Sequence, residues 1–182
     1  MARFYPQLND DLCAFIAQQH VFFTATAPSR GRINLSPKGM DTFRCLGPTT
    51  VAYLDLTGSG NETGAHLRED GRLTIMFCSF AERPLILRLY GRGRVVARGG
   101  AEWSEFAAGF VELPGTRQII ILDIDSVQTS CGFGVPRYAF EGERPTLTAW
   151  AASKGEDELR RYREKNNSRS IDGLPTGQDD NE

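Results

Sequence analysis

Histidine, tryptophan and methionine are scarce in this chain, and long apolar runs are missing from it. The two histidines, His20 and His66, are too far apart for the usual ligand spacing of a zinc site, so we expect no metal centre. No stretch approaches the length of about eighteen apolar residues that a membrane helix needs. The N-terminus also lacks an apolar leader core, so we expect an unexported protein that stays out of membranes.

Net charge, cysteine spacing and chain length limit the expected partners, location and number of domains. The formal net charge is −2, which gives no overall field to attract nucleic acid, and we expect none as a partner. The four cysteines are far apart and contain no C-x-x-C, which favours reduced thiols and a cytoplasmic location. A chain of 182 residues is long enough for one domain with its own core. We expect that domain over residues 1–166, followed by a polar tail over 167–182 that is ordered only if something holds it.

Apolar patterning predicts a β-rich α+β protein. Strands are expected at 21–27, 32–35, 51–56, 73–80, 85–96 and 118–124, the last extended or followed by 126–130. Helices are expected from Asn9 to about His20, at 63–70, at 102–110 and within 143–166. Ser36 and Pro37 are expected to end the second strand. Six or seven strands joined by tight turns indicate an antiparallel barrel with helical additions. The interior of so small a barrel is filled by side chains, so a cofactor would lie in a groove outside it.

Two segments carry the residues that suggest a cofactor site. The first, Asn34–Gly39, places a hydroxyl, a proline ring and a lysine at a strand end. The second, Thr57–Thr63, is a Gly-rich turn before a helix, where free backbone N–H groups and the helix dipole favour a phosphate. A solvated strand end and an ordinary capped turn are the competing interpretations, because neither segment is a G-x-G-x-x-G or a P-loop. The candidate cofactor-binding residues are Asn34, Ser36, Pro37, Lys38, Thr57, Gly58, Ser59, Gly60, Asn61, Thr63, His66 and Arg88.

A cluster of arginines offers a third source of positive charge. Arg88, Arg92 and Arg94 have the same parity along one predicted strand, so they share a face unless a bulge intervenes. Facing a groove, they would bind phosphate; an exposed strand face is the competing interpretation. His66, on the helix after the glycine turn, either reaches the cofactor or has a surface or capping role.

Catalytic side chains are not evident. Cys131 has no neighbouring histidine, and the sequence contains neither a Ser-His-Asp set nor paired carboxylates. Two glycines flank Phe133, which either stacks on a ligand or plugs the core, and we favour the core. Catalytic residues therefore stay unassigned.

In order along the chain, these segments resemble the pyridoxamine 5'-phosphate oxidase-related, FMN-binding split-barrel family, in particular an uncharacterised branch of it. The resemblance runs from about Asn9 to Pro175. It is carried by INLSPKG at 33–39, DLTGSGNET at 55–63, LRLYGRG at 87–93, SCGFGVP at 130–136, EKN at 164–166 and SIDGLP at 170–175. The resemblance implies a six-stranded antiparallel split β-barrel with flanking helices. It also implies a homodimer with FMN at the subunit interface, the strand ending at Lys38 beside the flavin and the Thr57–Asn61 turn near its phosphate.

The chain departs from the family at the phosphate. The oxidases carry an Arg-Lys pair just after the turn, where this sequence has Glu62 and Thr63. Lys38, Arg88 or an arginine of the partner chain such as Arg117 would have to replace that pair. The oxidases' C-terminal Arg-x-His pattern is also absent, so pyridoxamine phosphate is not assigned as the substrate.

The leading hypothesis is a cytoplasmic, homodimeric, FMN-dependent oxidoreductase acting on a small molecule. Two competing hypotheses are a deazaflavin (F420) or haem/tetrapyrrole protein on the same barrel, and a flavin-binding protein without catalytic activity. The F420 hypothesis requires Arg88, Arg92 and Arg94 to line an extended basic groove.

Overall fold

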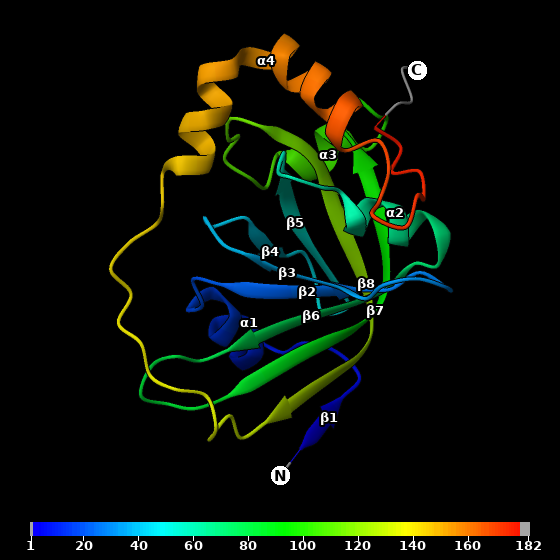
Figure 1. The fold of residues 1–182 in the computed structure, drawn as a ribbon. Coiled ribbons are helices and arrows are strands. Elements are labelled where there is room, and N and C mark those ends of the chain that lie inside the picture. The colour runs from blue at the N-terminus through cyan, green and yellow to red at the C-terminus, as the bar shows by residue number, and fades with distance from the viewer. Residues whose placement is uncertain (1, 179–182) are drawn as a thin grey trace.

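The computed structural model describes residues 2–178, as a curled antiparallel sheet with helices around it (Figure 1). Met1 and residues 179–182, the outer ends of the two expected units, lie outside the described residues. The elements are β1 (Arg3–Tyr5), α1 (Asp10–Ala17), β2 (Phe22–Thr26), β3 (Asn34–Lys38), β4 (Phe43–Cys45), β5 (Thr50–Leu56), α2 (Glu62–Glu69), β6 (Arg72–Cys78), β7 (Ile86–Ala97), α3 (Trp103–Ala107), β8 (Thr116–Ser130) and α4 (Thr146–Asn166).

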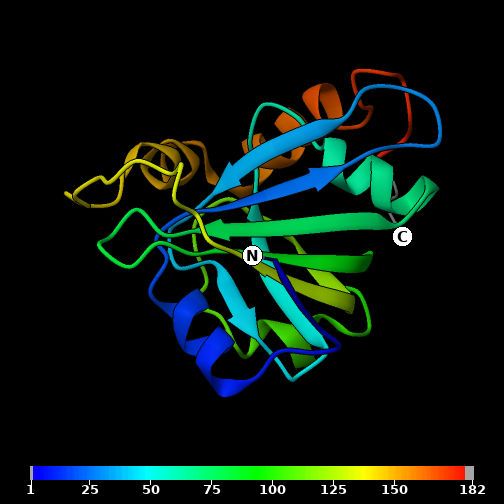
Figure 2. The same ribbon diagram turned by 90° about the horizontal axis from the view of Figure 1, so that it is seen from below.

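The predicted antiparallel split barrel is confirmed, with more strands than expected. The sheet has eight strands in the order β3-β2-β6-β7-β8-β5-β4, and β1 pairs with the far end of β8. The view from below shows how strongly it curls (Figure 2). The prediction of six strands was wrong because β1 and β4 have only three residues each, too few to show an alternating pattern.

The end of β3 also differs from the prediction. Ser36 and Pro37 do not end the strand, which pairs with β2 through Lys38, with Pro37 opposite Phe23. Since β3 is an edge strand, Pro37 can lack an N–H without breaking a ladder on both sides. The extra residues carry Lys38 to the open edge of the sheet.

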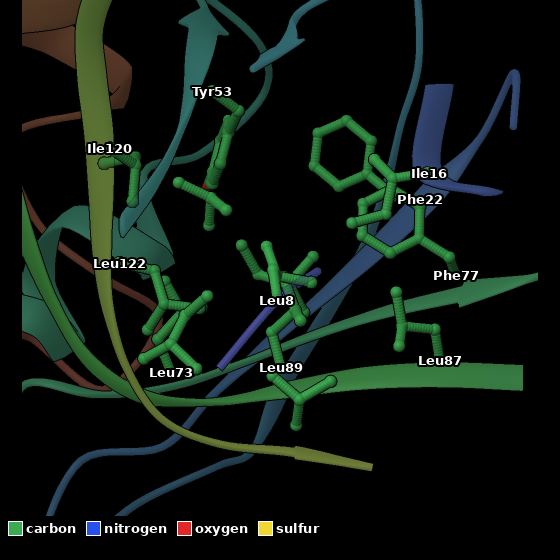
Figure 3. Packing of buried hydrophobic residues seen from close by; sticks show 14 of the residues in the cluster. Leu8, Ile16, Phe22, Tyr53, Leu73, Phe77, Leu87, Leu89, Ile120 and Leu122 are labelled. Carbon is green, nitrogen blue, oxygen red and sulfur yellow. The ribbon is translucent and has the colours of Figure 1, made fainter. Parts of the chain in front are cut away.

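Strand β8 separates two apolar clusters. Ile120 and Leu122 face the barrel interior, whereas Ile119 and Ile121 pack outward against residues of and around α3. Figure 3 shows the interior cluster, which includes Leu8, Ile16, Phe22, Tyr53, Leu73, Phe77, Leu87 and Leu89. This filled interior leaves ligand sites only outside the barrel, as the sequence predicted.

Two glycines of β7 permit close packing. A Cβ at Gly91 would lie 1.9 Å from the Asp123 carbonyl oxygen, and one at Gly93 would lie 2.8 Å from Leu67 Cδ2. The register of β7 and β8 shifts beside Gly91. The strand therefore bends there and lets α2 approach the sheet.

The helix expected within residues 143–166 is confirmed as α4, and the described part of the tail after it is held to the molecule. Helix α4 contains a kink at Gly155, whose φ is +71°, and ends at Asn166. The following segment, residues 167–178, packs on α2, where the Ile171 N–H donates to the Glu62 carboxylate. Asn167 and Thr176 are fully buried. The described part of the polar tail is thus fixed to the molecule.

Candidate functional site

A cavity of about 420 Å³ lies between the end of β3 and the turn from β5 into α2. It joins the two segments that the sequence singled out. Nine of the twelve candidate residues line it, namely Asn34, Ser36, Pro37, Lys38, Gly58, Ser59, Gly60, Asn61 and Thr63. The remaining wall includes Glu62, Arg117 and Leu147.

The turn from β5 into α2 presents unused backbone donors to this cavity. Thr57 is buried behind the turn, where its N–H and its hydroxyl both donate to the Gly115 carbonyl oxygen. Among the described residues, no hydrogen bond uses an N–H of residues 58–64 as its donor. These groups lie at the N-terminus of an eight-residue helix. Such an arrangement suits an anion, because the N–H groups and the helix dipole point the same way.

Asn61 adds a buried donor without a partner. Its side chain does not cap α2 but lies over Gly64, where a Cβ would come within 2.7 Å of the amide. The Asn61 Oδ1 atom accepts from Gln118 Nε2 at 2.8 Å. The Nδ2 atom has no partner within the described chain, although the residue is only 1% exposed. A buried, unsatisfied amide at a cavity wall is costly unless a ligand accepts from it.

Asp55 holds the two cations of the site in place. Its carboxylate accepts from Lys38 Nζ at 3.0 Å, from Arg117 Nε at 2.8 Å and from Gln118 Nε2 at 2.9 Å. Burial alone would raise the pKa of Asp55, but the charges and hydrogen bonds of Arg117 and Lys38 outweigh it and hold that pKa well below its usual value. The carboxylate therefore stays ionised and ties β3 to β5 and β8.

Arg117 supplies the positive charge that the turn lacks. Its Nη1 atom donates to the Gly60 carbonyl oxygen at 2.9 Å and to Asn167 Oδ1 at 3.0 Å. It belongs to the same chain as the turn, whereas the sequence suggested a partner's arginine. Behind the turn, Arg163 Nη1 donates to the Thr57 hydroxyl at 3.2 Å.

A second network positions the β3 side of the cavity. Asn34 Nδ2 donates to the hydroxyls of Thr26 at 3.3 Å and Thr63 at 3.2 Å, and Asn34 Oδ1 accepts from the Ser36 hydroxyl. The Thr26 hydroxyl lies 2.9 Å from His66 Nδ1 and is free to donate to it. His66 is buried and does not line the cavity, and its connection to the cavity wall runs through Thr26 and Asn34.

The arginines of β7 lie elsewhere. Arg88 Nη1 donates to Ser130 Oγ at 3.3 Å, Arg92 to the Asp70 carbonyl oxygen and Arg94 to the Glu102 carboxylate. None of the three lines the cavity. The structure therefore does not bring Arg88 to the other candidate residues.

The segment around Cys131 is also away from the cavity. Phe133 is 81% exposed, so the preference for a core position was wrong. Gly132 has a φ of +68°, and a Cβ there would lie 2.9 Å from the Leu85 backbone nitrogen. The glycine allows close approach to another backbone segment and leaves the aromatic ring outside the core.

Sequence reasoning missed Asp55, Gln118 and Arg163, and saw Arg117 only as a partner's residue. Asp55 carried a usable signal, since it follows the apolar run Val51–Leu54 and a buried carboxylate needs partners. Arg163 carried none, because it stands in a charged helix where surface arginines look the same. No three metal-ligating side chains cluster anywhere in residues 2–178. No helix in that range combines the length and apolar content needed to cross a bilayer.

Comparisons with known proteins show the family to which this chain belongs. Residues 8–131 match the family model described as pyridoxamine 5'-phosphate oxidase. The chain is 44% identical over 198 residues to the pyridoxamine 5'-phosphate oxidase family protein ustO of Aspergillus flavus, covering 96% of this chain and 78% of that protein. This chain therefore belongs to the pyridoxamine 5'-phosphate oxidase family.

Solved structures share the fold at low identity. HupZ of Group A Streptococcus is 20% identical, with a TM-score of 0.54, over 73% of this chain and 99% of that one. A FAD binding protein of Mycobacterium smegmatis is 13% identical, with a TM-score of 0.50, over 68% of this chain and 96% of that one.

Proposed function

We propose that this member of the pyridoxamine 5'-phosphate oxidase family is a flavoprotein that binds FMN in the cavity between β3 and the β5–α2 turn, and that it works as an oxidoreductase. One observation carries the proposal: the unpaired N–H groups of residues 58–64 meet the unpartnered amide of Asn61 beside Arg117. The description of the Mycobacterium smegmatis relative as FAD-binding supports a flavin as the ligand class.

The turn is the phosphate end of the proposed site. Backbone N–H groups of Gly58–Thr63 would bind the phosphate oxygens, with the α2 dipole behind them. Arg117 lines the same wall and takes the place of the absent Arg-Lys pair. The Glu62 carboxylate is directed to the C-terminal segment, where it accepts from the Ile171 N–H. The residues present thus fit a phosphate-bearing cofactor.

Strand β3 is the ring end of the proposed site. A bound flavin supplies hydride chemistry at its N5 atom. Lys38 donates one hydrogen bond to Asp55, and its ammonium group retains donors for an electron-rich ring edge. Asn34 and Ser36 are oriented by their hydrogen-bond network to face the same cavity. No side chain of this wall is a free general base, so these residues bind and tune the cofactor.

A homodimer is part of the proposal. β3 is an edge strand, and its outer side exposes Leu35 (66%) with Ile33 (78%) just before it. Adjacent exposed apolar side chains on an unpaired edge favour cover by another chain. A second copy placed there would also close the cavity, which β3 borders. A cytoplasmic location accords with the four free cysteines.

A flavin-binding protein without turnover is the second candidate. It is favoured by the pairing of both cavity cations with Asp55, which leaves neither cation as an unpaired group for proton transfer. The deazaflavin F420 would need a basic groove formed by Arg88, Arg92 and Arg94. Those three arginines are hydrogen-bonded to other elements, which disfavours F420 as the ligand.

The test is a ligand titration of the purified protein. Flavin absorption bands in the isolated protein, or saturable quenching of FMN fluorescence on titration, support the proposal, and F420 and haem serve as competing ligands. Lys38→Ala should weaken FMN binding by about tenfold, the loss expected for one charge-assisted hydrogen bond. Lys154→Ala, which removes a surface pair with Glu158 on α4, is the matched control. Tight binding of F420 or haem with no uptake of FMN would overturn the assignment. Turnover with reduced nicotinamide separates the oxidoreductase from the second candidate.

A further inference from the structure

A second and larger cavity lies beside the candidate cofactor site. It has a volume of about 910 Å³, which is within the range of small-molecule sites. The two cavities share Pro37–Met40 and Leu147 as wall residues. A molecule in the larger cavity would therefore contact the same short segment that borders the smaller one.

The segment between β8 and α4 forms the outer wall. In Figure 1 this segment (yellow) runs apart from the sheet before it joins α4. The inner wall comes from Gln18 to Val21, directly after α1, and from Phe80 and Ala81 after β6. The cavity is thus a space held between the barrel and a long connection.

Aromatic rings dominate this space. The rings of His20 and Phe140 stack with centroids 3.6 Å apart and an interplanar angle of 5°. Tyr138 packs against Phe80 with centroids 5.6 Å apart, and Trp150 also lines the wall. Phe140 remains 53% exposed and Tyr138 68%. Ring faces left open toward a cavity gain most from a flat apolar partner, which removes them from water and stacks on them.

The outer wall lies outside the part of the chain that matches the family model. The family match ends at residue 131, whereas the outer wall consists of residues 138–150. The cavity is therefore suited to select a ligand of this chain and its near relatives.

We propose that the larger cavity binds a flat, mainly apolar aromatic small molecule, stacked among His20, Phe140 and Trp150 and reaching Lys38 at the border with the cofactor site. That this molecule is the substrate rests on the proposed function; that the cavity binds this ligand class does not. Continuity with the smaller cavity, together with enclosure by the chain's own connection, favours a small molecule over a second copy as occupant.

The binding test uses 8-anilino-1-naphthalenesulfonate as the probe and Trp150 as the reporter. The chain has two tryptophans, so Trp103→Phe leaves Trp150 as the single donor for energy transfer to the probe. We expect saturable one-to-one binding to the native protein. 1-Naphthalenesulfonate should compete and methanesulfonate should not, since the ring carries the affinity.

Two matched variants test whether the probe binds in the larger cavity. Phe140→Ala should weaken binding about threefold to tenfold, the effect of losing one aromatic stack. Phe133→Ala removes an even more exposed ring (81%) outside the cavity and should leave binding unchanged. Molecular mass by light scattering is recorded on each sample. Absence of saturable binding, equal effects of the two variants, or binding that appears only when a dimer dissociates would each overturn the proposal.

The substrate role has its own readout. With FMN bound, saturating probe should perturb the flavin absorption spectrum, because the two cavities share wall residues. An unchanged spectrum despite probe binding would refute the substrate role and leave the ligand class standing. Failure of FMN uptake with intact probe binding would refute the proposed function alone.

Discussion

Asp55→Asn is the most informative substitution in this molecule. The side chain is 1% exposed and its carboxylate accepts from Lys38, Arg117 and Gln118 at 2.8 to 3.0 Å. Asparagine keeps the shape but removes the charge and turns one acceptor into a donor. Two cations then share a buried site without a counter-charge.

The expected loss of stability follows from breaking a buried ion pair. Such a change costs about 3–5 kcal/mol, since the remaining charge is left without compensation. For a domain of this size, each kcal/mol of lost stability lowers the midpoint of thermal unfolding by about 2–4 °C. We therefore expect this midpoint to decrease by about 6–20 °C. Asp157→Asn should leave the midpoint nearly unchanged, because it removes an exposed pair with Arg160 on α4.

The pH dependence gives an independent check of the same reasoning. The folded-state pKa of Asp55 is lowered, so its stabilisation is complete above the unfolded-state value of about 3.9 and is lost as the pH falls through and below it. Urea denaturation should therefore show that the free energy of unfolding differs between the native protein and Asp55→Asn by a constant amount from about pH 5 to 8. The difference should shrink below about pH 4. A loss under about 1 kcal/mol at neutral pH, or a difference that grows in acid, would refute the assigned role of Asp55.

Three further predictions concern the same face and the thiols. Gly64→Ala should weaken FMN binding about fivefold, measured by fluorescence titration, because the new Cβ displaces the Asn61 amide; unchanged affinity would contradict the role of that amide. Iodoacetamide followed by mass spectrometry should modify exposed Cys131 first. Cys45 should react last, since burial, with the neighbouring Cys13, raises its pKa to about 12; equal rates would contradict this. Lys38→Ala should raise the Kd for FMN about tenfold in the same titration. An unaffected Kd would contradict the placement of the flavin ring beside β3.

Much of the site was readable from the sequence because its two halves are local. The Gly-rich turn and the end of β3 each combine a strand-like run with small polar residues, and such segments meet when their strands lie in one curled sheet. The barrel was readable for the same reason, since long strands such as β7 and β8 repeat a pattern that three residues cannot show.

The site residues that the sequence could not predict depend on how distant strands and helices pair and pack. Gln118 stands opposite Asp55 only because β8 pairs with β5 in one register, and no local pattern around Gln118 fixes that pairing. Arg163 and Asn167 reach the turn through the kinked path of α4, set by a positive φ at Gly155. The exposed position of Phe133 follows from the turn at 132–135, where the Val135 N–H donates to the Gly132 carbonyl oxygen, and composition alone does not reveal it.

The most direct measurement compares FMN with riboflavin, which differ by the phosphate alone. If the turn from β5 into α2 holds that phosphate, the Kd for FMN at low salt should be at least about tenfold lower than that for riboflavin, and the gap should narrow as salt rises. Equal affinities for the two flavins, or binding of neither, would contradict the account.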